Sequence, residues 1–509
     1  MSAARAQILH AFRARLKAST RTPNQLAALR TPFRDVLSHA AVYLFDERCP
    51  NLSARSRLSP GQRRLFIALA GMLTCALIAA PVMVLIGLNT LFLVFCLSVF
   101  LLRLVLLYLS IGREAEHRAA PRAVADDELP MVTILCPMYR EERGLPHLVD
   151  ALLGLDYPNT KLDIKLLLEE DDAATIACAR LLCQRTPFDI VIVPDSLPRT
   201  KPKACNYGLW SALGDLLVIY DAEDRPERDQ LRIAAATFAA GPPELACVQA
   251  RLNYYNREKT WITRLFAIEY ALLFDLVLPG LAKLRAPLPL GGTSNVFKTD
   301  HLIAVGGWDP FNVTEDADLG MRLAAAGLTS QTIDSTTYEE ATSRLAPWLR
   351  QRSRWIKGYL QTWMVHVRAQ GPSRLWTTFL SLHLLIGSVV VAALFNPIFW
   401  LLYGLWLSGA ADWAEPLFPT PLDAFAAAAL LAGNFFHLWL FMLAPMRRRW
   451  LDLVPYALLA PIYWLMQSVA GYIALWQFIT KPFYWEKTTH SAGESAEAVL
   501  AKVGGEAAA

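Results

Sequence analysis

The sequence predicts an α/β domain inserted between two groups of membrane-spanning α-helices. Of its 509 residues, 54% are hydrophobic and only 18% are charged. The mean hydropathy of +0.30 is too high for an ordinary soluble protein. Long uncharged runs lie at both ends of a middle segment that has a normal globular mixture of charge, glycine and proline. The chain is therefore expected to be part membrane protein and part soluble domain.

Residues 1–62 are expected to form a cytosolic N-terminal segment. They are rich in arginine and contain no short apolar stretch followed by a cleavage site, so no secretory signal peptide is predicted. The net charge of +4 is small and dispersed, which argues against nucleic acid as a partner. The eight cysteines include no CxxC pair, and this favours buried thiols in a reducing compartment over disulfides or a zinc site.

Residues 63–112 are predicted to form a transmembrane hairpin. Two apolar runs, 65–88 and 91–111, each supply the roughly 20 residues that a bilayer requires, and Asn89-Thr90 is the expected turn. Basic residues flank both ends, so the hairpin is expected to start and end in the cytoplasm. Arg103 lies inside the second run. Its side chain either extends toward the cytosolic face or has a function within the membrane.

Between residues 129 and 347, short apolar strands alternate with amphipathic helices. The clearest strands are MVTILCP, KLLL, DIVIVP and LLVIYD, and each is followed by a polar loop. This alternation predicts a largely parallel α/β sheet, in which ligands gather at the carboxyl ends of the strands. Residues 348–370 carry aromatic and apolar side chains at helical spacing among arginine and lysine. That pattern predicts a helix in the membrane interface.

Further apolar runs within residues 375–480 predict three or four C-terminal spans. The first run, 375–407, is long enough for one span or for two short spans broken at Asn396-Pro397. An even number of C-terminal spans returns the tail to the cytosol. It also leaves Arg447, Arg448 and Arg449 outside, against the usual distribution of positive charge.

Carboxylates directly follow the strand LLVIY, in Asp221-Ala222-Glu223-Asp224. Hard divalent cations prefer carboxylate oxygen, and alternate residues leaving a strand can direct two carboxylates to one ion. Helix caps and solvated turns have a similar composition, so the cluster alone leaves both interpretations open. Asp221, Glu223 and Asp224 are candidate metal ligands.

Two more motifs have chemical potential. Asp316, in Thr314-Glu315-Asp316, is a candidate general base, although acidic residues are also common at the amino end of a helix. Gln351, Arg354 and Trp355 lie in QRSRW, where a ring can stack on a sugar and arginine can bind phosphate through two parallel hydrogen bonds. A basic aromatic interface helix without function would have the same composition.

The order of these motifs along the chain is informative. An acidic pair, the DAE sequence, TED and QxxRW follow one another, and this series resembles the D, DxD, TED and QxxRW motifs of processive family 2 glycosyltransferases. That family includes cellulose, hyaluronan and chitin synthases. The segments DERCPNLSARSRL and GGTSNVFKTDHLIAVGGWDPFNVTEDADLGMRL are most similar to a bacterial subgroup that includes mixed-linkage β-glucan synthases. The resemblance covers the whole soluble segment and the flanking membrane layout.

The resemblance implies a GT-A nucleotide-sugar-binding fold. Pro137, Tyr139 and Glu141 match the PxYxE positions that contact the nucleotide. Asp171 or Asp172 would contact uracil or ribose, and the family's usual DDG is DDA here, which leaves the choice between them open.

The resemblance also implies a diphosphate site and a metal site. Lys203 and Asn206, in KPKACNYG, match the KAxxxN segment near the diphosphate. Asp221 and Glu223 would hold Mg²⁺ or Mn²⁺, with Asp221 also beside the nucleotide sugar. Glutamate replaces the second aspartate of the family's DxD motif, and Asp224 is able to share its role.

Asp316 matches the general base of the family. The clamp for the acceptor and the diphosphate would comprise Thr314, Glu315, Gln351, Arg354 and Trp355. The implied reaction is inverting transfer from a UDP-sugar, best guessed as UDP-glucose, onto a growing β-linked polysaccharide that is then translocated. Such enzymes have a mobile gating loop after the late spans. Residues 483–490, within the tail 481–509, are its candidate, and this favours the even number of spans.

The resemblance further implies exopolysaccharide synthesis by a multi-pass protein of the bacterial inner membrane with its catalytic domain in the cytosol. Its partners would be the donor, the polysaccharide, the lipid bilayer and, in some cases, regulatory or export proteins. Two alternatives are a non-processive enzyme that acts on a lipid carrier and a non-catalytic membrane scaffold or receptor. The size of the product separates the first alternative from polymerisation. Loss of an essential carboxylate would support the second, but Asp221 and Asp316 are both present.

Overall fold

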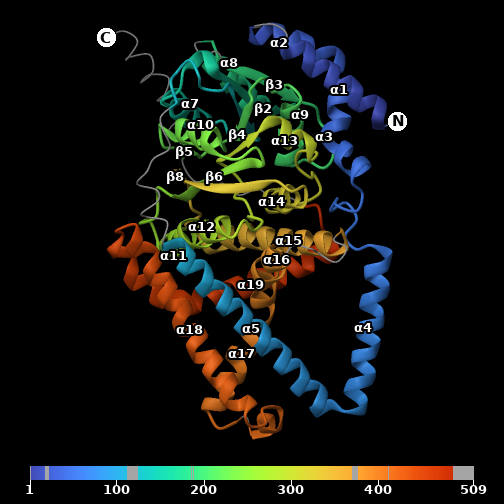
Figure 1. Ribbon diagram of the computed structural model, residues 1–509, viewed down its shortest axis with the longest axis vertical. Coiled ribbons are helices and arrows are strands. Elements are labelled where there is room, and N and C mark those ends of the chain that lie inside the picture. The colour runs from blue at the N-terminus through green and yellow to red at the C-terminus, as the bar shows by residue number, and fades with distance from the viewer. Residues whose placement is uncertain are drawn as a thin grey trace.

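The computed structural model describes residues 2–17, 22–111, 124–184, 186, 188–369, 376–410 and 412–484. Figure 1 shows an α/β domain above a group of long helices, with three N-terminal helices along one side of the domain. In the sequence, the α/β domain lies between two groups of apolar helices, as predicted.

One eight-stranded sheet forms the centre of the α/β domain, in the order β3-β2-β1-β4-β7-β6-β8-β5. The strands are β1 (Val132–Met138), β2 (Leu162–Glu169), β3 (Asp189–Val193), β4 (Leu216–Ile219), β5 (Arg225–Pro226), β6 (Leu245–Tyr254), β7 (Asn295–Lys298) and β8 (Thr329–Glu339). β1 to β4 are the four predicted strands and are mutually parallel, whereas β7 is antiparallel to both of its neighbours. The carboxyl ends of β1 and β4 therefore lie together, and the loops with Tyr139 and Asp221 start there.

Helices cover both faces of the sheet, because alternate residues of a strand point to opposite sides. Ile134 and Cys136 of β1 belong to one core with α7, α8 and α10, whereas Leu135 belongs to a second core with α9 and the N-terminal helices. The domain helices are α7 (Leu145–Leu153), α8 (Ala173–Leu182), α9 (Lys201–Leu209), α10 (Gln230–Ala240), α13 (Thr299–Ala304), α14 (Glu315–Ala325) and α15 (Leu345–Ala369).

The N-terminal helices form an arm that packs on the domain. They are α1 (Ser2–Lys17), α2 (Pro23–Arg30) and α3 (Arg34–Arg48). Arg30 bonds both carboxylate oxygens of Asp189 in β3, at 2.5 and 2.7 Å, and Lys165 lies 3.1 Å from the same carboxylate. All three side chains are buried. Leu9, Phe12 and other apolar residues of the arm join the core that contains Leu135.

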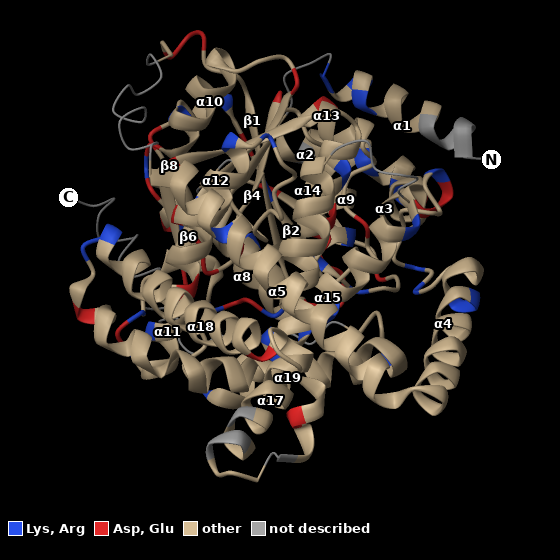
Figure 2. Ribbon diagram, turned by 60° about the horizontal axis from the view of Figure 1, so that its bottom comes forward, with Lys and Arg blue, Asp and Glu red and all other residues tan. Residues whose placement is uncertain are grey.

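The membrane hairpin consists of α4 (Pro60–Ala79) and α5 (Pro81–Ile111). The prediction of a turn at Asn89-Thr90 is wrong, because both residues lie inside α5. The break is at Ala80, whose φ of −149° and ψ of 66° are not helical. Pro81 explains this, since proline disfavours a helical residue before it and begins a helix well. Figure 2 shows α5 almost without charged residues.

Three helical segments follow the α/β domain. The first is continuous through α16 (Trp376–Phe379), a π-helical segment Leu380–Ile386 and α17 (Gly387–Leu407). Pro397 lies inside α17, so the run is one helix and not two short spans. A 3₁₀ helix, Asp412–Leu417, leads to α18 (Leu422–Arg447). Helices α17 and α18 thus form a second hairpin. Its connecting segment contacts α5 of the first hairpin, where the Asn89 side chain lies 3.4 Å from the carbonyl oxygen of Leu417.

Both ends of α19 (Ala460–Thr480) lie against the α/β domain. Before it, Arg448 bonds Asp275 and Arg257 bonds Asp452, which is in the 3₁₀ helix Leu451–Leu459. After it, Lys357 Nζ donates to the Tyr484 carbonyl at 2.8 Å. Figure 1 shows α19 running beneath α15. Arg447 to Arg449 and residues 481–484 therefore lie on the same side of the helices as the domain. The sequence pattern had placed the tail and these arginines on opposite sides, and the structure removes that conflict.

Six helices are long and apolar enough to cross a membrane, and they indicate a membrane protein. One of them, Trp261–Lys283, is not among the spans predicted from the sequence. It comprises α11 (Trp261–Leu272), a π-helical segment Leu273–Val277 and α12 (Leu278–Lys283). Its apolar window is 83% buried inside the protein. The α11–α12 segment is thus part of the buried interior next to the α/β domain. Helix α5 packs on it, where Gly280 approaches the Leu106 backbone.

Candidate active site

A cavity of about 1810 Å³ begins at the carboxyl ends of β1 and β4 and continues between α5, α17 and α18. Sites in α/β sheets form at such strand ends. Four of the predicted motifs, which are far apart in the sequence, meet there. The predicted residues that line the cavity are Pro137, Tyr139, Glu141, Asp221, Glu223, Thr314, Glu315, Asp316, Gln351, Arg354 and Trp355. Asp171, Asp172, Lys203, Asn206 and Asp224 do not line it.

Glu315 and Asp316 begin helix α14 inside the cavity. Asp316 Oδ1 accepts a hydrogen bond from the Ala317 N–H at 2.7 Å. Burial raises the pKa of Asp316 to about 6, against the opposing charges of Lys201 and Arg354. Burial and the neighbouring Asp316 raise the pKa of Glu315 to about 8. A carboxyl group that titrates near neutral pH is suited to remove a proton from a hydroxyl.

The three acidic residues after β4 have different environments. Asp221 and Glu223 line the cavity, whereas Asp224 is buried behind them. The Asp224 carboxylate accepts from the Asp221 N–H at 2.7 Å and from the Thr293 hydroxyl. Burial and the charges of Asp221 and Glu223 raise the pKa of Asp224 well above its usual range. Asp224 therefore fixes the turn that presents Asp221.

Asp221 and Glu223 fit a hard divalent cation, because two carboxylates leave one strand toward the same cavity. Within the described residues, no cluster of three or more His, Cys, Asp or Glu side chains is arranged to hold a metal. The other ligands of an ion at this position would be diphosphate oxygens and water, which is the usual pattern for Mg²⁺.

A lysine that sequence analysis did not select lies beside this carboxylate pair. Lys201 Nζ is 2.5 Å from Asp221 Oδ2 and 2.8 Å from the Gly292 carbonyl oxygen, and it lines the cavity. Burial acts to lower the pKa of Lys201, but the Asp221 charge outweighs it and the pKa is raised. Lys201 is therefore a cation at neutral pH, in reach of Asp221 and facing Glu315.

Lys203 and Asn206 have structural partners in place of cavity contacts. Lys203 Nζ lies 2.7 Å from Glu169 Oε2 and also contacts the carbonyl oxygens of Pro194 and Ser196. Asn206 Nδ2 donates to the carbonyl oxygens of Ala41 and Trp308. Both side chains are buried. Residues two apart on a helix face different directions, so only Lys201 of this lysine pair faces the cavity.

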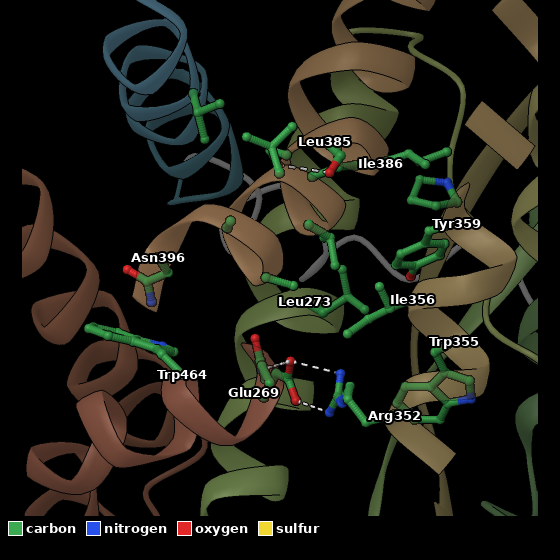
Figure 3. Close-up of a pocket in the computed structure, with 18 of the residues that line it drawn as sticks. Glu269, Leu273, Arg352, Trp355, Ile356, Tyr359, Leu385, Ile386, Asn396 and Trp464 are labelled. Atoms are coloured by element: carbon green, nitrogen blue, oxygen red, sulfur yellow. Dashed lines mark hydrogen bonds and ion pairs between the residues drawn. The ribbon is translucent and has the colours of Figure 1, made fainter. Parts of the chain in front are cut away.

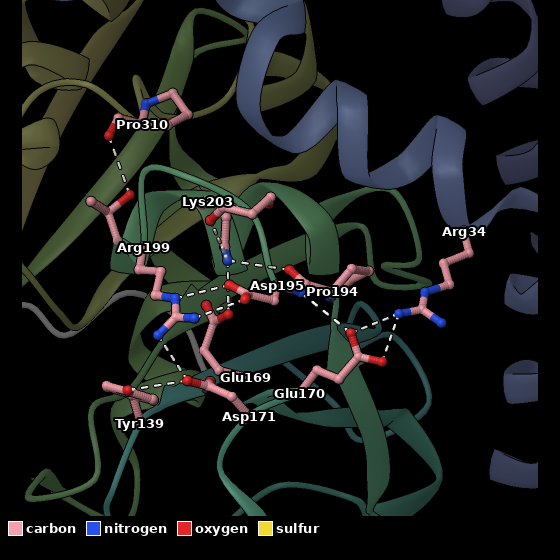
Figure 4. A network of polar contacts seen from close by, with 12 residues as sticks. Arg34, Tyr139, Glu169, Glu170, Asp171, Pro194, Asp195, Arg199, Lys203 and Pro310 are labelled. Carbon is pink, nitrogen blue, oxygen red and sulfur yellow. Dashed lines mark hydrogen bonds and ion pairs between the residues drawn. The ribbon is translucent and has the colours of Figure 1, made fainter.

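The two aspartates after β2 are also distinct. Asp172 is buried and caps α8, where it accepts from the N–H groups of Arg140 and Thr175. Asp171 accepts from the Tyr139 hydroxyl at 3.4 Å and from Arg199 at 2.8 Å. Figure 4 shows Arg199 between Asp171 and Asp195 at this end of the site. Tyr139 and Arg199 both line the cavity, so Asp171 is the aspartate connected to it.

Helix α15 forms the opposite wall of the cavity. The Trp355 ring lies 6.1 Å from Tyr270 in a stacked arrangement, and the Arg352 guanidinium lies 4.7 Å from Trp355. Arg352 also pairs with Glu269 of α11, as Figure 3 shows. Gly358 allows a close approach to the TED loop, because a Cβ there would lie 2.4 Å from the Thr314 side chain. Helix α15 is therefore packed against the residue that precedes α14, two positions before Asp316.

The chain matches two families of known proteins. Residues 216–473, just over half of the chain, match the family described as "Glycosyl transferase family group 2", and residues 133–294 match "Glycosyl transferase family 2". The chain belongs to glycosyl transferase family group 2. Its α/β domain has the GT-A fold of nucleotide-sugar-dependent glycosyltransferases, with apolar helices on both sides in the sequence.

Several curated proteins resemble this family member over part of their length. "Probable glycosyltransferase YdaM" from Bacillus subtilis (strain 168) is 25% identical over 45% of this chain and 56% of that protein. "Probable glucomannan 4-beta-mannosyltransferase 1" from Arabidopsis thaliana is 26% identical over 46% of this chain and 44% of that protein. The chain thus spans about half the length of these relatives. The names of these relatives do not confirm the resemblance to β-glucan synthases that the sequence suggested.

Among solved structures, the chain is similar to "Mannosyltransferase PcManGT from Pyrobaculum calidifontis in complex with GDP-Man and Mn2+". The sequence identity is 21% and the TM-score is 0.45, with 73% of this chain and 99% of that chain covered.

Four residues of the site were not selected from the sequence: Lys201, Arg199, Glu269 and Arg352. Arg352 lies inside QRSRW, so its neighbours gave a signal. Lys201 is the first residue of KPKACNYG, the segment that contains Lys203, and Arg199 lies two residues before it, so position alone could have suggested both. Glu269 had one signal, a carboxylate inside a long apolar helix, which marks a functional candidate when the helix is recognised.

Proposed function

We propose that this protein is a membrane-embedded, inverting glycosyltransferase that polymerises a hexose from a nucleoside diphosphate sugar into a β-linked polysaccharide. One observation carries the proposal. A single cavity joins the candidate base Asp316, the carboxylates Asp221 and Glu223 and the ring of Trp355, and it continues among α5, α17 and α18. The product is proposed to leave through this membrane-facing part of the cavity.

In the proposed reaction, Asp316 removes the proton of the acceptor hydroxyl as that oxygen attacks the anomeric carbon. The new glycosidic bond forms on the face opposite the leaving diphosphate, so an α-linked donor gives a β-linked product. Lys201 and Arg354 bring positive charge toward the leaving group. A divalent metal held by Asp221 and Glu223 would neutralise further charge on the diphosphate.

The donor is proposed to bind through its nucleotide at the end of the cavity lined by Tyr139 and Arg199, which both contact Asp171. UDP-glucose is the preferred donor, on the resemblance to β-glucan synthases. The relatives named as glucomannan mannosyltransferases add a mannose donor as a second choice. Mg²⁺ and Mn²⁺ are both compatible with two carboxylate ligands.

The location is proposed to be the bacterial inner membrane, with the α/β domain in the cytosol. Arg63 and Arg64 lie near the start of α4, and Figure 1 shows that end of α4 nearest the domain. Arg448, which follows α18, bonds Asp275. Basic residues at the cytoplasmic ends of spans favour this orientation. Phe483 packs on Phe311, which supports a contact of the tail with the domain, whereas residues 485–490 of the expected gating loop lie outside the described residues.

The decisive experiment measures nucleotide release by the purified protein with a panel of UDP-glucose, UDP-N-acetylglucosamine and GDP-mannose in Mg²⁺ and in Mn²⁺. Asp316→Asn is expected to bind the donor and to lose transfer by about 10²- to 10⁴-fold. Asp229→Asn, an exposed carboxylate outside the cavity, is the matched control. Full transfer by Asp316→Asn would contradict the proposed mechanism.

Product size tests whether the enzyme polymerises. A long polysaccharide supports the proposal, whereas addition of one sugar to a lipid carrier would replace polymerisation with the non-processive reaction. Linkage-specific glycosidases then identify the bond formed.

A further inference from the structure

An arginine in the membrane-facing part of the cavity has no role in the proposed transfer. Arg103 is the one charged residue in the 31-residue helix α5. Its Nη1 atom lies 2.9 and 3.1 Å from the two ring nitrogens of His437 on α18, and both side chains line the cavity. Arg103 therefore faces the cavity and the opposite helix, and its contact with His437 replaces the simple extension toward the cytosolic face that the sequence left open.

Within the described residues, Arg103 forms no ion pair, because no aspartate or glutamate oxygen lies within 4 Å of its guanidinium. The carboxylate whose charge acts on it, Glu269, is already paired with Arg352. Arg352 is bonded to Glu269, and Glu269 is also held by Tyr463 at 2.8 Å and Gln467 at 3.1 Å. Asp423 lines the same cavity but lies 14 residues from His437 on α18, or about 21 Å along the helix axis.

A guanidinium in this position favours an anionic ligand. A charge at membrane depth is costly unless a partner compensates it. Arginine remains protonated, and its planar N–H groups match two oxygens of a phosphate. His437 lies beside the guanidinium and supplies a second polar contact.

The surroundings of this pair fit an apolar chain attached to the anion. Cys96 and Val99 precede Arg103 on the same face of α5 and also line the cavity. On the other side, the His437 ring lies 5.2 Å from Trp464 and 5.6 Å from Phe441. A charged head group at Arg103 with a hydrocarbon chain along these residues satisfies both parts of the site.

We propose that Arg103 and His437 form a phosphate-binding site for a lipid phosphate in the membrane-facing part of the cavity. The inference rests on the proposed function. It names a second ligand class for the membrane-facing part of the cavity, through which the product is proposed to leave. Arg352 connects the two regions, because it contacts both Trp355 of the clamp and Glu269 beside the membrane-facing part.

The test measures lipid binding without any sugar donor, so that failure of the transferase activity does not affect it. The full chain is placed in phosphatidylcholine nanodiscs doped with phosphatidic acid, and retained lipid is counted by native mass spectrometry. Wild type is expected to retain phosphatidic acid, and Arg103→Gln is expected to lower its occupancy about 10- to 100-fold. Arg264→Gln is the matched control, because Arg264 contacts Tyr456 and does not line the cavity.

Two further arms keep the result interpretable. Arg103→Lys keeps the cation and is expected to restore part of the binding, which separates charge from misfolding. Inorganic phosphate is added as a competitor. Displacement of the lipid by inorganic phosphate only at high concentration supports a lipid phosphate, and equal affinity for both assigns the site to phosphate in general. Equal retention of phosphatidic acid by wild type and Arg103→Gln overturns the inference. Displacement of phosphatidic acid by a neutral oligosaccharide but not by inorganic phosphate also overturns it.

Discussion

Lys201 and Lys203 are two residues apart on α9 and are expected to respond to substitution in opposite ways. Lys203 is 1% exposed, and its ammonium neutralises Glu169, which is 6% exposed, at 2.7 Å. Lys203→Met leaves the carboxylate of Glu169 buried without its cation. Breaking a buried ion pair in this way costs about 3–5 kcal/mol, which corresponds to a fall in Tm of roughly 6–20 °C for a domain of this size.

Lys201→Met removes a cation from the cavity but leaves no buried charge isolated, because Asp221 is part-exposed to the cavity. Its Tm is expected to stay within a few degrees of wild type. Loss of one group that stabilises developing charge typically lowers kcat by about 10²- to 10³-fold. The nucleotide-release rate is therefore the property that changes.

Differential scanning fluorimetry and nucleotide release on the same preparations compare the two variants. The expected pattern is a stable, slow Lys201→Met and a destabilised Lys203→Met whose residual folded fraction keeps a near-normal rate. If Lys203→Met is stable and inactive while Lys201→Met turns over normally, the lysine at the diphosphate is Lys203, and the assignment of Lys201 from the cavity geometry is refuted.

Three other predictions concern the same cavity. Because burial raises the pKa of Asp316 to about 6 and its ionised form is the base, the rate of transfer is expected to fall as pH drops below 6, to about a tenth at pH 5, and a flat profile from pH 5 to 8 would contradict this. Gly358→Ala forces a Cβ against Thr314 and is expected to lower kcat by about 10²-fold, whereas Gly71→Ala, which meets no atom within 4 Å, serves as its control in the same release assay. Arg199→Gln removes a charged bond to Asp171 and is expected to raise the donor KM about tenfold in steady-state kinetics, with little change in kcat; an equal loss in kcat would place Arg199 in the chemical step.

Much of the α/β domain could be predicted from the sequence because its signals are local. The four runs read as strands became β1 to β4, and the polar residues after them became the loops of the cavity. The TED and QxxRW motifs came together because α14 and α15 both start at this side of the sheet. The contact between Gly358 and Thr314 joins residues that are 44 positions apart, and a local sequence pattern does not encode such a contact.

Other features depended on long-range contacts. Residues 261–283 are as apolar as a membrane span, but they lie under the sheet and are covered by other parts of the chain. The course of α19 was similarly hidden, because length and composition do not specify on which side its ends lie. The ion pairs of Arg448 and the contact of Lys357 with residue 484 decide it. By contrast, the hairpin break has a local signal in the sequence, which is Pro81.

The N-terminal arm has a practical consequence for studying this protein in pieces. Leu9, Phe12 and Leu37 are completely or almost completely buried, in a core shared with strand residues such as Leu135 and Val191. A fragment that starts at residue 129 would expose that apolar surface to water and would leave Asp189 without Arg30. The point where the chain leaves the bilayer is therefore not the point where the folding unit begins. The smallest piece that could remain soluble would have to carry the arm, fused across the excised hairpin.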